Sequence, residues 1–165
     1  MVEGFEDDWE DVMPVIADLL KRARRESVPV VLVQHCGRGP SHPLNETASG
    51  WPLHEAVDPQ PGDLRVRKVW SDSFQATDLR GLLRARAVTR VVIVGAQTEF
   101  CVDTTTRRAL SLGYDVDLVA NGHTTSENEV LSRAQIVAHH NATLGSLAVD
   151  GVTMRVLPSV VIDFA

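Results

Sequence analysis

Short, continuous apolar runs alternate with helix-forming segments along this chain, and the alternation constrains its fold more than any other feature. The clearest runs are residues 28–35, 90–96 and 114–121. A run of this kind, without polar alternation, is typical of a strand that is buried on both faces of a sheet. Because strands separated by helical crossovers lie parallel, the chain is predicted to form an α/β fold. We expect a three-layer α-β-α, doubly wound, mostly parallel sheet of Rossmann-like type.

Helical spacing of apolar residues indicates where the crossovers lie. Helices are predicted over residues 11–25, 76–88, 101–113 and 126–144. Ser126 and Glu129 have the spacing of a capping box for the last of these. Residues 64–70 and 152–164 have the composition of strands. The segment 35–62 has neither period and is rich in Gly, Pro, Ser and His; loops of this length in a compact domain are usually functional or mobile.

Length and composition limit the possible functions. The 165 residues fit a single domain, 1–165, and the formal charge of -6 argues against nucleic acid or an anionic membrane as partner. We expect no membrane span and no signal peptide, because the chain has no apolar run of about 18 residues. Its two cysteines, Cys36 and Cys101, form no disulfide framework or CxxC motif. No GxGxxG follows a strand, which excludes a dinucleotide-binding enzyme. We therefore expect a cytoplasmic domain with reduced thiols and a small-molecule substrate.

Cys101 follows the apolar run 90–96 and stands at the first turn of the next predicted helix. Ligands of doubly wound sheets bind beyond the carboxyl ends of the strands. Free N–H groups at a helix N-terminus favour a thiolate and can stabilise an oxyanion. A cysteine near a strand end is also commonly a small buried apolar residue. Position alone leaves both interpretations open.

Three motifs in the same order resemble those of a known superfamily. They are "VVIVGAQTEFCVDTTTRRALSLGYDVDLV" from Val91, "RKVWSDSFQATDLRGLL" from Arg67 and "NGHTTSENEVLSRAQIVAHHNATL" from Asn121. The first resembles the cysteine signature, and the second the lysine motif, of the isochorismatase-like cysteine hydrolases, which include nicotinamidases and related amidases. The third resembles the downstream region of one amidase-like branch.

The resemblance implies a site and a reaction. Cys101 would be the nucleophile and Lys68 the catalytic lysine, although most lysines are solvated surface charges. A cis peptide would join Ala96 to Gln97, and the N–H groups of Gln97 and Cys101 would form the oxyanion hole. The expected function is hydrolysis of a small amide C–N bond through a cysteine thioester, without a cofactor. Members of the family usually form homodimers or larger homo-oligomers.

The family's third catalytic residue, an aspartate at the end of a first strand in the middle of the sheet, has no match here. Residues 1–5 resemble the segment just after that aspartate in members of the family, so we expect the first strand to be missing, with unpaired backbone on both neighbouring strands. Asp7, Asp8 and Asp11 are expected to be solvated residues that lead the first helix. The alternative function is therefore an N-terminally truncated or degenerate member without activity, acting as a binding or oligomeric protein.

Aromatic residues near the motifs are candidates for a substrate pocket. They are Phe5, Trp51 and Trp70, whereas Phe74 is a candidate that we place in the core instead. Cys36 is expected to be a spectator or a pocket wall. No sequence motif specifies the substrate.

Histidines of the long loop give only a weak metal signal, because the Asp-x-His pair of metal-binding nicotinamidases is absent. We expect His35, His42 and His54 to form hydrogen bonds or caps and no metal to bind. The remaining histidines are expected to be structural: His123, His139 and His140.

Overall fold

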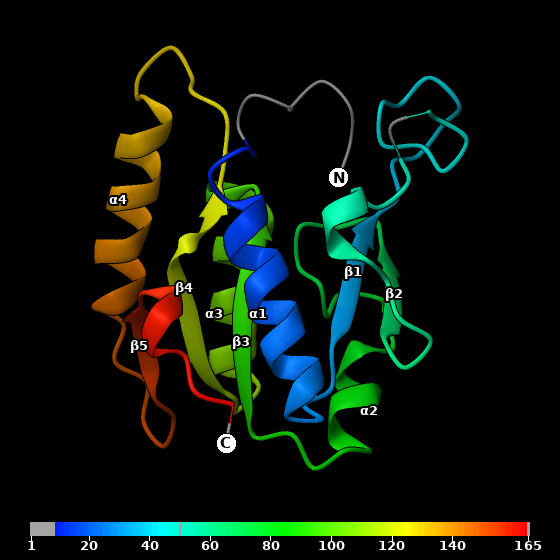
Figure 1. The fold of residues 1–165 in the computed structure, drawn as a ribbon. Coiled ribbons are helices and arrows are strands. Elements are labelled where there is room, and N and C mark those ends of the chain that lie inside the picture. The colour runs from blue at the N-terminus through cyan, green and yellow to red at the C-terminus, as the bar shows by residue number, and fades with distance from the viewer. Residues whose placement is uncertain (1–8, 50, 165) are drawn as a thin grey trace.

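The computed structural model describes residues 9–49 and 51–164, and its parallel strands form a sheet in two parts (Figure 1). One part pairs β1 (Val31–His35) with β2 (Leu64–Lys68). The other has the order β3 (Arg90–Ala96), β4 (Asp115–Thr124) and β5 (Met154–Leu157). All of these pairings are parallel. The predicted α/β fold with a parallel sheet is confirmed.

Helices cover both faces of the sheet (Figure 1). On one face, Leu19 of α1 (Met13–Arg25) packs with Val119 of β4. On the other, Leu118 of β4 packs with Leu144 of α4 (Arg133–Gly145). The face of α4 also carries α2 (Leu79–Arg84) and α3 (Asp103–Ser111). Successive residues of a strand point to opposite faces, so neighbouring apolar residues of β4 supply both layers of the core.

Helix α1 follows from its sequence spacing. Its buried residues, Met13, Ile16, Leu19 and Ala23, form one stripe, and Pro14 lies in the first turn, where no N–H is required. An ion pair near its C-terminus, Arg24 Nη2 to Asp63 Oδ2 at 2.7 Å, ties the helix to the turn before β2.

The predicted start of the helix at residue 126 is wrong, as is its capping box. Helix α4 begins at Arg133 and is capped by Ser132 with Gln135. The side-chain oxygen of Asn128 accepts hydrogen bonds from the N–H groups of Val130 and Leu131, at 2.9 and 2.8 Å. Asn side chains compete with helices in this way because they satisfy the backbone locally.

Other predicted elements are shorter than expected. The helix predicted over residues 76–88 is limited to α2. Residue 87, after the end of this helix, has a positive φ, as does residue 58 in the long loop. The strand-like segment 152–164 contains only β5, followed by a 3-10 turn, η4 (Ser159–Val161). None of the helices within the described ranges is long and apolar enough to cross a membrane.

The two parts of the sheet are separated by a space between β1 and β3. Among the described residues, β1 pairs only with β2, and β3 pairs only with β4. A cavity of about 550 Å³ occupies this space, lined by residues of both strands and by Ile16 and Leu19 of α1. In Figure 1, α1 lies in front of the sheet, between β3 and β1. Within the described part of the chain, the interior edges of β1 and β3 therefore face each other without a strand between them.

Candidate active site

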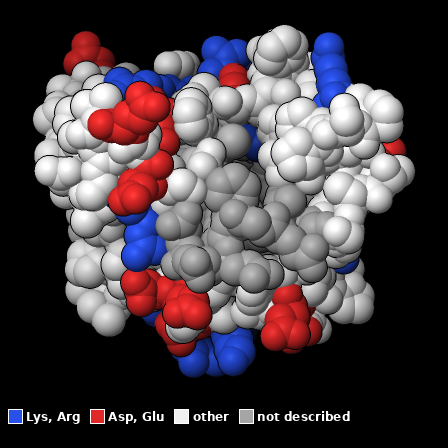
Figure 2. All heavy atoms as spheres, turned by 90° about the horizontal axis from the view of Figure 1, so that it is seen from above, with Lys and Arg blue, Asp and Glu red and all other residues white. Residues whose placement is uncertain are grey.

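The carboxyl ends of the parallel strands bring the predicted residues to one edge of the sheet. His35 ends β1, Lys68 ends β2, and Cys101 follows β3. Figure 2 looks onto this edge from above and shows the described Asp and Glu side chains around its periphery. This is the edge at which doubly wound sheets bind ligands.

Cys101 lies in a π-helical turn, η3 (Thr98–Val102), which continues into α3. The carbonyl of Gln97 accepts hydrogen bonds from the N–H groups of Phe100, at 3.2 Å, and Val102, at 3.1 Å. The helical segment therefore begins at Thr98, before the position predicted from sequence. The N–H groups at the start of a helical segment tend to lack partners within it, and the Cys101 N–H lies among them, between those of Phe100 and Val102. Its side chain is half-buried.

The peptide bond between Ala96 and Gln97 is cis, as the family resemblance predicts. Gly95, just before it, has a φ of 130°, a backbone conformation that favours glycine. Both features lie at the junction between β3 and η3.

Lys68 is buried although it carries a charge. It is 5% exposed, and its Nζ donates a hydrogen bond to the Ser71 carbonyl at 2.7 Å. No carboxylate within the described ranges forms an ion pair with it. Lysines are rarely buried without a charged partner because desolvation of the ammonium is costly. A lysine held in this way is more consistent with a functional role than with a surface charge.

The charge of Lys68 also acts on its neighbour at the end of β1. Burial lowers the pKa of His35, and the positive charge of Lys68 and the proximity of His42 lower it further. His35 and Lys68 are register partners in the β1–β2 pair. The imidazole of His35 is therefore held in its neutral form beside the ammonium.

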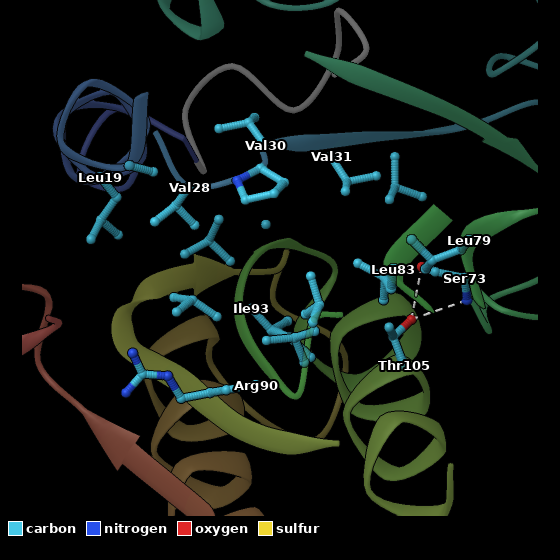
Figure 3. A pocket seen from close by; sticks show the side chains of 18 of the residues that line it. Leu19, Val28, Val30, Val31, Ser73, Leu79, Leu83, Arg90, Ile93 and Thr105 are labelled. Atoms are coloured by element: carbon cyan, nitrogen blue, oxygen red, sulfur yellow. Dashed lines mark hydrogen bonds between the residues drawn. The ribbon is translucent and has the colours of Figure 1, made fainter. Parts of the chain in front are cut away.

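Cys101 and Lys68 line the same cavity, the one between β1 and β3. Ser73 and Thr105 also line it and are hydrogen-bonded to each other, with 2.9 Å between their hydroxyl oxygens (Figure 3). The Ser73 N–H donates to Thr105 Oγ1 at 3.1 Å, and Thr105 Oγ1 donates to the Ser71 carbonyl at 3.3 Å. The turn that holds Lys68 is thus fixed to α3 one helical turn after Cys101.

A second buried hydrogen-bond chain lies behind the cysteine turn. Asn141 Nδ2 donates to the Ala120 carbonyl at 3.0 Å, which leaves Asn141 Oδ1 to accept from His123 Nε2 at 2.9 Å. His123 Nδ1 must then accept from the Thr98 hydroxyl, at 2.9 Å. Thr98 is 0% and His123 2% exposed. This series of hydrogen bonds fixes the first residue of η3 to β4 and α4. It also selects the neutral Nε2–H tautomer of His123.

We expect His123 to make the protein less stable in acid. Burial lowers the pKa of His123, and His140 lowers it further, against the hydrogen bond to Asn141. Above about pH 6.5 the residue is neutral in both states and contributes nothing. Below that pH the unfolded chain takes up a proton that the folded chain refuses, so stability falls by about 1.4 kcal/mol per pH unit until the folded pKa is reached. In His123→Gln this component should be absent.

Urea unfolding of both proteins at pH 7.5, 6.5 and 5.5 measures the difference. His139→Gln, at an exposed position of α4, is the matched control and should keep the wild-type profile. Parallel loss of stability in wild type and His123→Gln would contradict the assignment.

The aromatic pocket candidates lie in different surroundings. Trp51 Nε1 donates to the His35 carbonyl at 2.9 Å, and its ring lies under Arg67, with 5.1 Å from guanidinium carbon to ring centroid. Trp70 is 49% exposed and lies under Arg38. Neither lines the cavity described above. Phe5 lies outside the described residues. Contact of these three side chains with substrate stays a prediction.

Phe74 both lines the cavity and belongs to the core. Its ring stacks on that of Tyr114, with 5.9 Å between centroids. The packing is consistent with the core position that we expected for Phe74.

Two of the loop histidines cap local turns. His42 Nδ1 accepts from the Leu44 N–H at 3.0 Å, and His54 Nδ1 accepts from the Ala56 N–H at 3.1 Å. In the described ranges, no group of three His, Cys, Asp or Glu residues is arranged to hold a metal ion.

The carboxylates considered as substitutes for the family's aspartate do not reach Lys68 in the described structure. Asp11 lies 3.6 Å from Arg133, with an exposed side chain. Asp7 and Asp8 lie outside the described residues. Cys36, the other free thiol, has a pKa raised by burial and by Glu46, despite the opposing charge of Arg67.

Five polar residues that position the site were not predicted from the sequence: Ser71, Ser73, Thr98, Thr105 and Asn141. Ser73 and Thr105 occur within the motifs quoted above, but the motifs do not reveal that they bond to each other. Their contacts join segments far apart in sequence, and only the fold brings them together.

Comparisons with known proteins bear on this site. A family model described as "Isochorismatase domain" matches residues 5–147. The chain is 37% identical over 126 residues to a streptothricin hydrolase of Streptomyces noursei, with 75% of this chain and 50% of the relative covered. It thus spans half the length of that hydrolase. An uncharacterized isochorismatase family protein of Bacillus subtilis (strain 168), YrdC, is 30% identical over 156 residues, which cover 90% of this chain and 81% of the relative.

Two further matches are a shorter sequence match and a match to a solved structure. A ureidoacrylate amidohydrolase, RutB, of Agrobacterium fabrum (strain C58 / ATCC 33970) is 38% identical over 60 residues, 36% of this chain and 26% of its own. A crystal structure of an isochorismatase family protein superposes with a TM-score of 0.73 at 35% identity, covering 86% of this chain and 82% of the other.

Proposed function

Because the chain belongs to the isochorismatase family, we propose that it is a cysteine-dependent amidohydrolase that cleaves the C–N bond of a small amide. The observation that carries the proposal is the shared cavity of Cys101 and Lys68 at the carboxyl edge of the sheet. A buried ammonium in the same cavity and the start of a helical segment both favour a thiolate, the reactive form. The similarity to a streptothricin hydrolase and to an amidohydrolase supports the reaction class.

In the proposed reaction, the Cys101 sulfur forms a bond to the amide carbonyl carbon. The N–H groups of Gln97 and Cys101 donate to the oxyanion that develops, because preorganised donors stabilise it most in the transition state. The C–N bond then breaks, and the leaving nitrogen takes a proton as it departs as ammonia or an amine. Water hydrolyses the thioester to a carboxylic acid and restores the thiol.

Lys68 has two roles in this scheme. In this proposal its ammonium lowers the free energy of the thiolate by a favourable charge interaction, and it delivers a proton to the leaving nitrogen. The family resemblance implies a carboxylate on a central strand as the base. The space between β1 and β3 opens beside Lys68, so a carboxylate there would pair with the ammonium and accept the Cys101 proton.

A panel of small primary amides, each incubated with the protein while ammonia release is followed, tests the proposal. Samples quenched in acid during turnover are analysed by mass spectrometry for an acyl group on the peptide that contains Cys101. Ammonia release together with that adduct is the expected result. Ammonia release with the adduct on neither cysteine would overturn the thioester mechanism. An absence of turnover, with Cys101 no more reactive than Cys36 toward iodoacetamide, would favour a non-catalytic binding protein.

A further inference from the structure

We propose that the hydrogen-bond chain Thr98–His123–Asn141 positions the oxyanion hole, so that side chains from β4 and α4 control turnover without touching the substrate. The inference rests on the proposed function, because it takes the N–H groups of Gln97 and Cys101 as the donors to the oxyanion. It goes beyond that function by assigning a role to three side chains that take no part in the reaction itself.

Thr98 is placed where it acts on both donors. It follows Gln97 directly and is the first residue of η3, the turn that also carries Cys101. The direction of each donor N–H depends on how the backbone around it is held. Donors stabilise an oxyanion most when they already point at the position where it develops. A hydrogen bond made by the Thr98 side chain therefore acts on the oxyanion hole through the backbone.

The register of β4 brings His123 beside this junction. From Ile93 to Gly95 strand β3 advances two residues, whereas from Leu118 to His123 its partner β4 advances five, so β4 bulges between them. Bulges next to active sites commonly redirect a side chain. Here the bulge makes His123 the register partner of Gly95 and places the imidazole where β3 ends and η3 begins.

Gly122 allows the bulge to lie against β3. A Cβ on this residue would come within 2.8 Å of the Val119 Cβ and 2.9 Å of the Val94 Cγ1, closer than side-chain carbons pack. The absence of a side chain thus keeps β4 near enough to β3 for His123 to bond to Thr98, 25 residues earlier in the sequence.

The other end of the hydrogen-bond chain is anchored to backbone. Asn141 Nδ2 donates to the carbonyl of Ala120, which lies within the bulge, and Asn141 Oδ1 accepts from His123. Each of the three side chains is thereby held in one orientation, since donor and acceptor alternate from the Ala120 carbonyl to the Thr98 hydroxyl. Fully satisfied buried networks of this kind make their surroundings rigid.

A role confined to stability is the alternative, because a buried network that loses one member leaves the others unpaired. The two roles differ in what they leave unchanged. A displaced oxyanion hole lowers kcat with little change in KM. It also leaves the reaction of Cys101 with iodoacetamide intact, because this alkylation forms no oxyanion. A general loss of structure would change all three quantities.

The test replaces Thr98 with valine, which has a similar shape but no hydroxyl, and measures kcat and KM for the most reactive amide of the panel. We expect kcat to fall about 10- to 100-fold, as when reacting groups are misplaced, whereas KM and the iodoacetamide rate change less than about twofold. Thr98→Ser keeps the hydroxyl and should recover most of the loss. Thr143→Val, on α4 with its hydroxyl 3.4 Å from His139 Nε2, is the matched control. An unchanged kcat in Thr98→Val, or a fall in kcat and alkylation together, would overturn the proposal.

Asn141→Ala tests whether the hydrogen-bond chain acts as one unit. This variant alone should also lower kcat. The double variant with Thr98→Val should lose no more than the larger of the two single losses, because either change breaks the same chain. A wild-type kcat in Asn141→Ala, or losses that multiply in the double variant, would contradict the proposed chain.

A measurement without substrate separates this inference from the hydrolase function. Relaxation dispersion of ¹⁵N reports microsecond-to-millisecond motion of single amides. We expect such motion at Gln97 and Cys101 in Thr98→Val but not in wild type, Thr98→Ser or Thr143→Val. Equal dispersion at these amides in wild type and Thr98→Val would refute the positioning role, whatever the turnover. If wild type releases no ammonia from any amide, the hydrolase function fails and the amide result alone decides the positioning role.

Discussion

Replacing Cys101 with alanine is expected to lower kcat/KM for amide hydrolysis by at least about 10³-fold, because no other group in the proposed mechanism can form the acyl intermediate. The fold should be retained. Cys101 is half-buried and lies at a turn that is fixed by other residues, among them Thr98 and His123. The loss would therefore appear in turnover and not in the unfolding midpoint.

Cys36→Ala is the matched control. Both cysteines are half-buried, but burial raises the pKa of Cys36, which makes its thiolate scarce at neutral pH. We expect this variant to keep wild-type activity and iodoacetamide to label Cys101 first. Activity that survives in Cys101→Ala, or a loss of equal size in Cys36→Ala, would contradict the assignment of the nucleophile.

Local sequence signals predicted the parallel sheet because buried strands and their helices have different periods. The run 90–96 coincides with β3. The same signals failed where a side chain competes with the backbone. Asn128 closes a turn that interrupts the helical pattern before Arg133. The spacing of apolar residues does not indicate such a turn.

The family resemblance, and not the periodicity, supplied the site residues. It placed Lys68 and Cys101 together, and the cavity includes both. It did not supply the bonds that hold them, such as the pair Ser73 and Thr105 or the chain through His123. These contacts depend on how elements distant in sequence pack against one another. No local pattern of residues encodes them.

Replacing Lys68 with methionine is expected to separate activity from stability. Activity should fall about 10²- to 10³-fold, the range lost when a proton-transfer group is removed. Alkylation of Cys101 by iodoacetamide at pH 7.5 should also become slower, since the thiolate loses a favourable charge. Stability should be unchanged or higher by about 1 kcal/mol, because burial of an apolar side chain carries no desolvation cost. The lost hydrogen bond to the Ser71 carbonyl offsets part of that gain.

The pairing of these results is what identifies the role of Lys68. Lysine occurs at only one other position, Lys21, which is exposed on α1. Lys21→Met is therefore the matched control and should change neither activity nor the alkylation rate. A structural lysine would lose stability and activity together when replaced. Lys68→Arg keeps the charge and should restore the alkylation rate more fully than the turnover, since the planar guanidinium cannot release a proton. An unchanged alkylation rate in Lys68→Met would show that the ammonium does not act on Cys101, whatever happened to turnover.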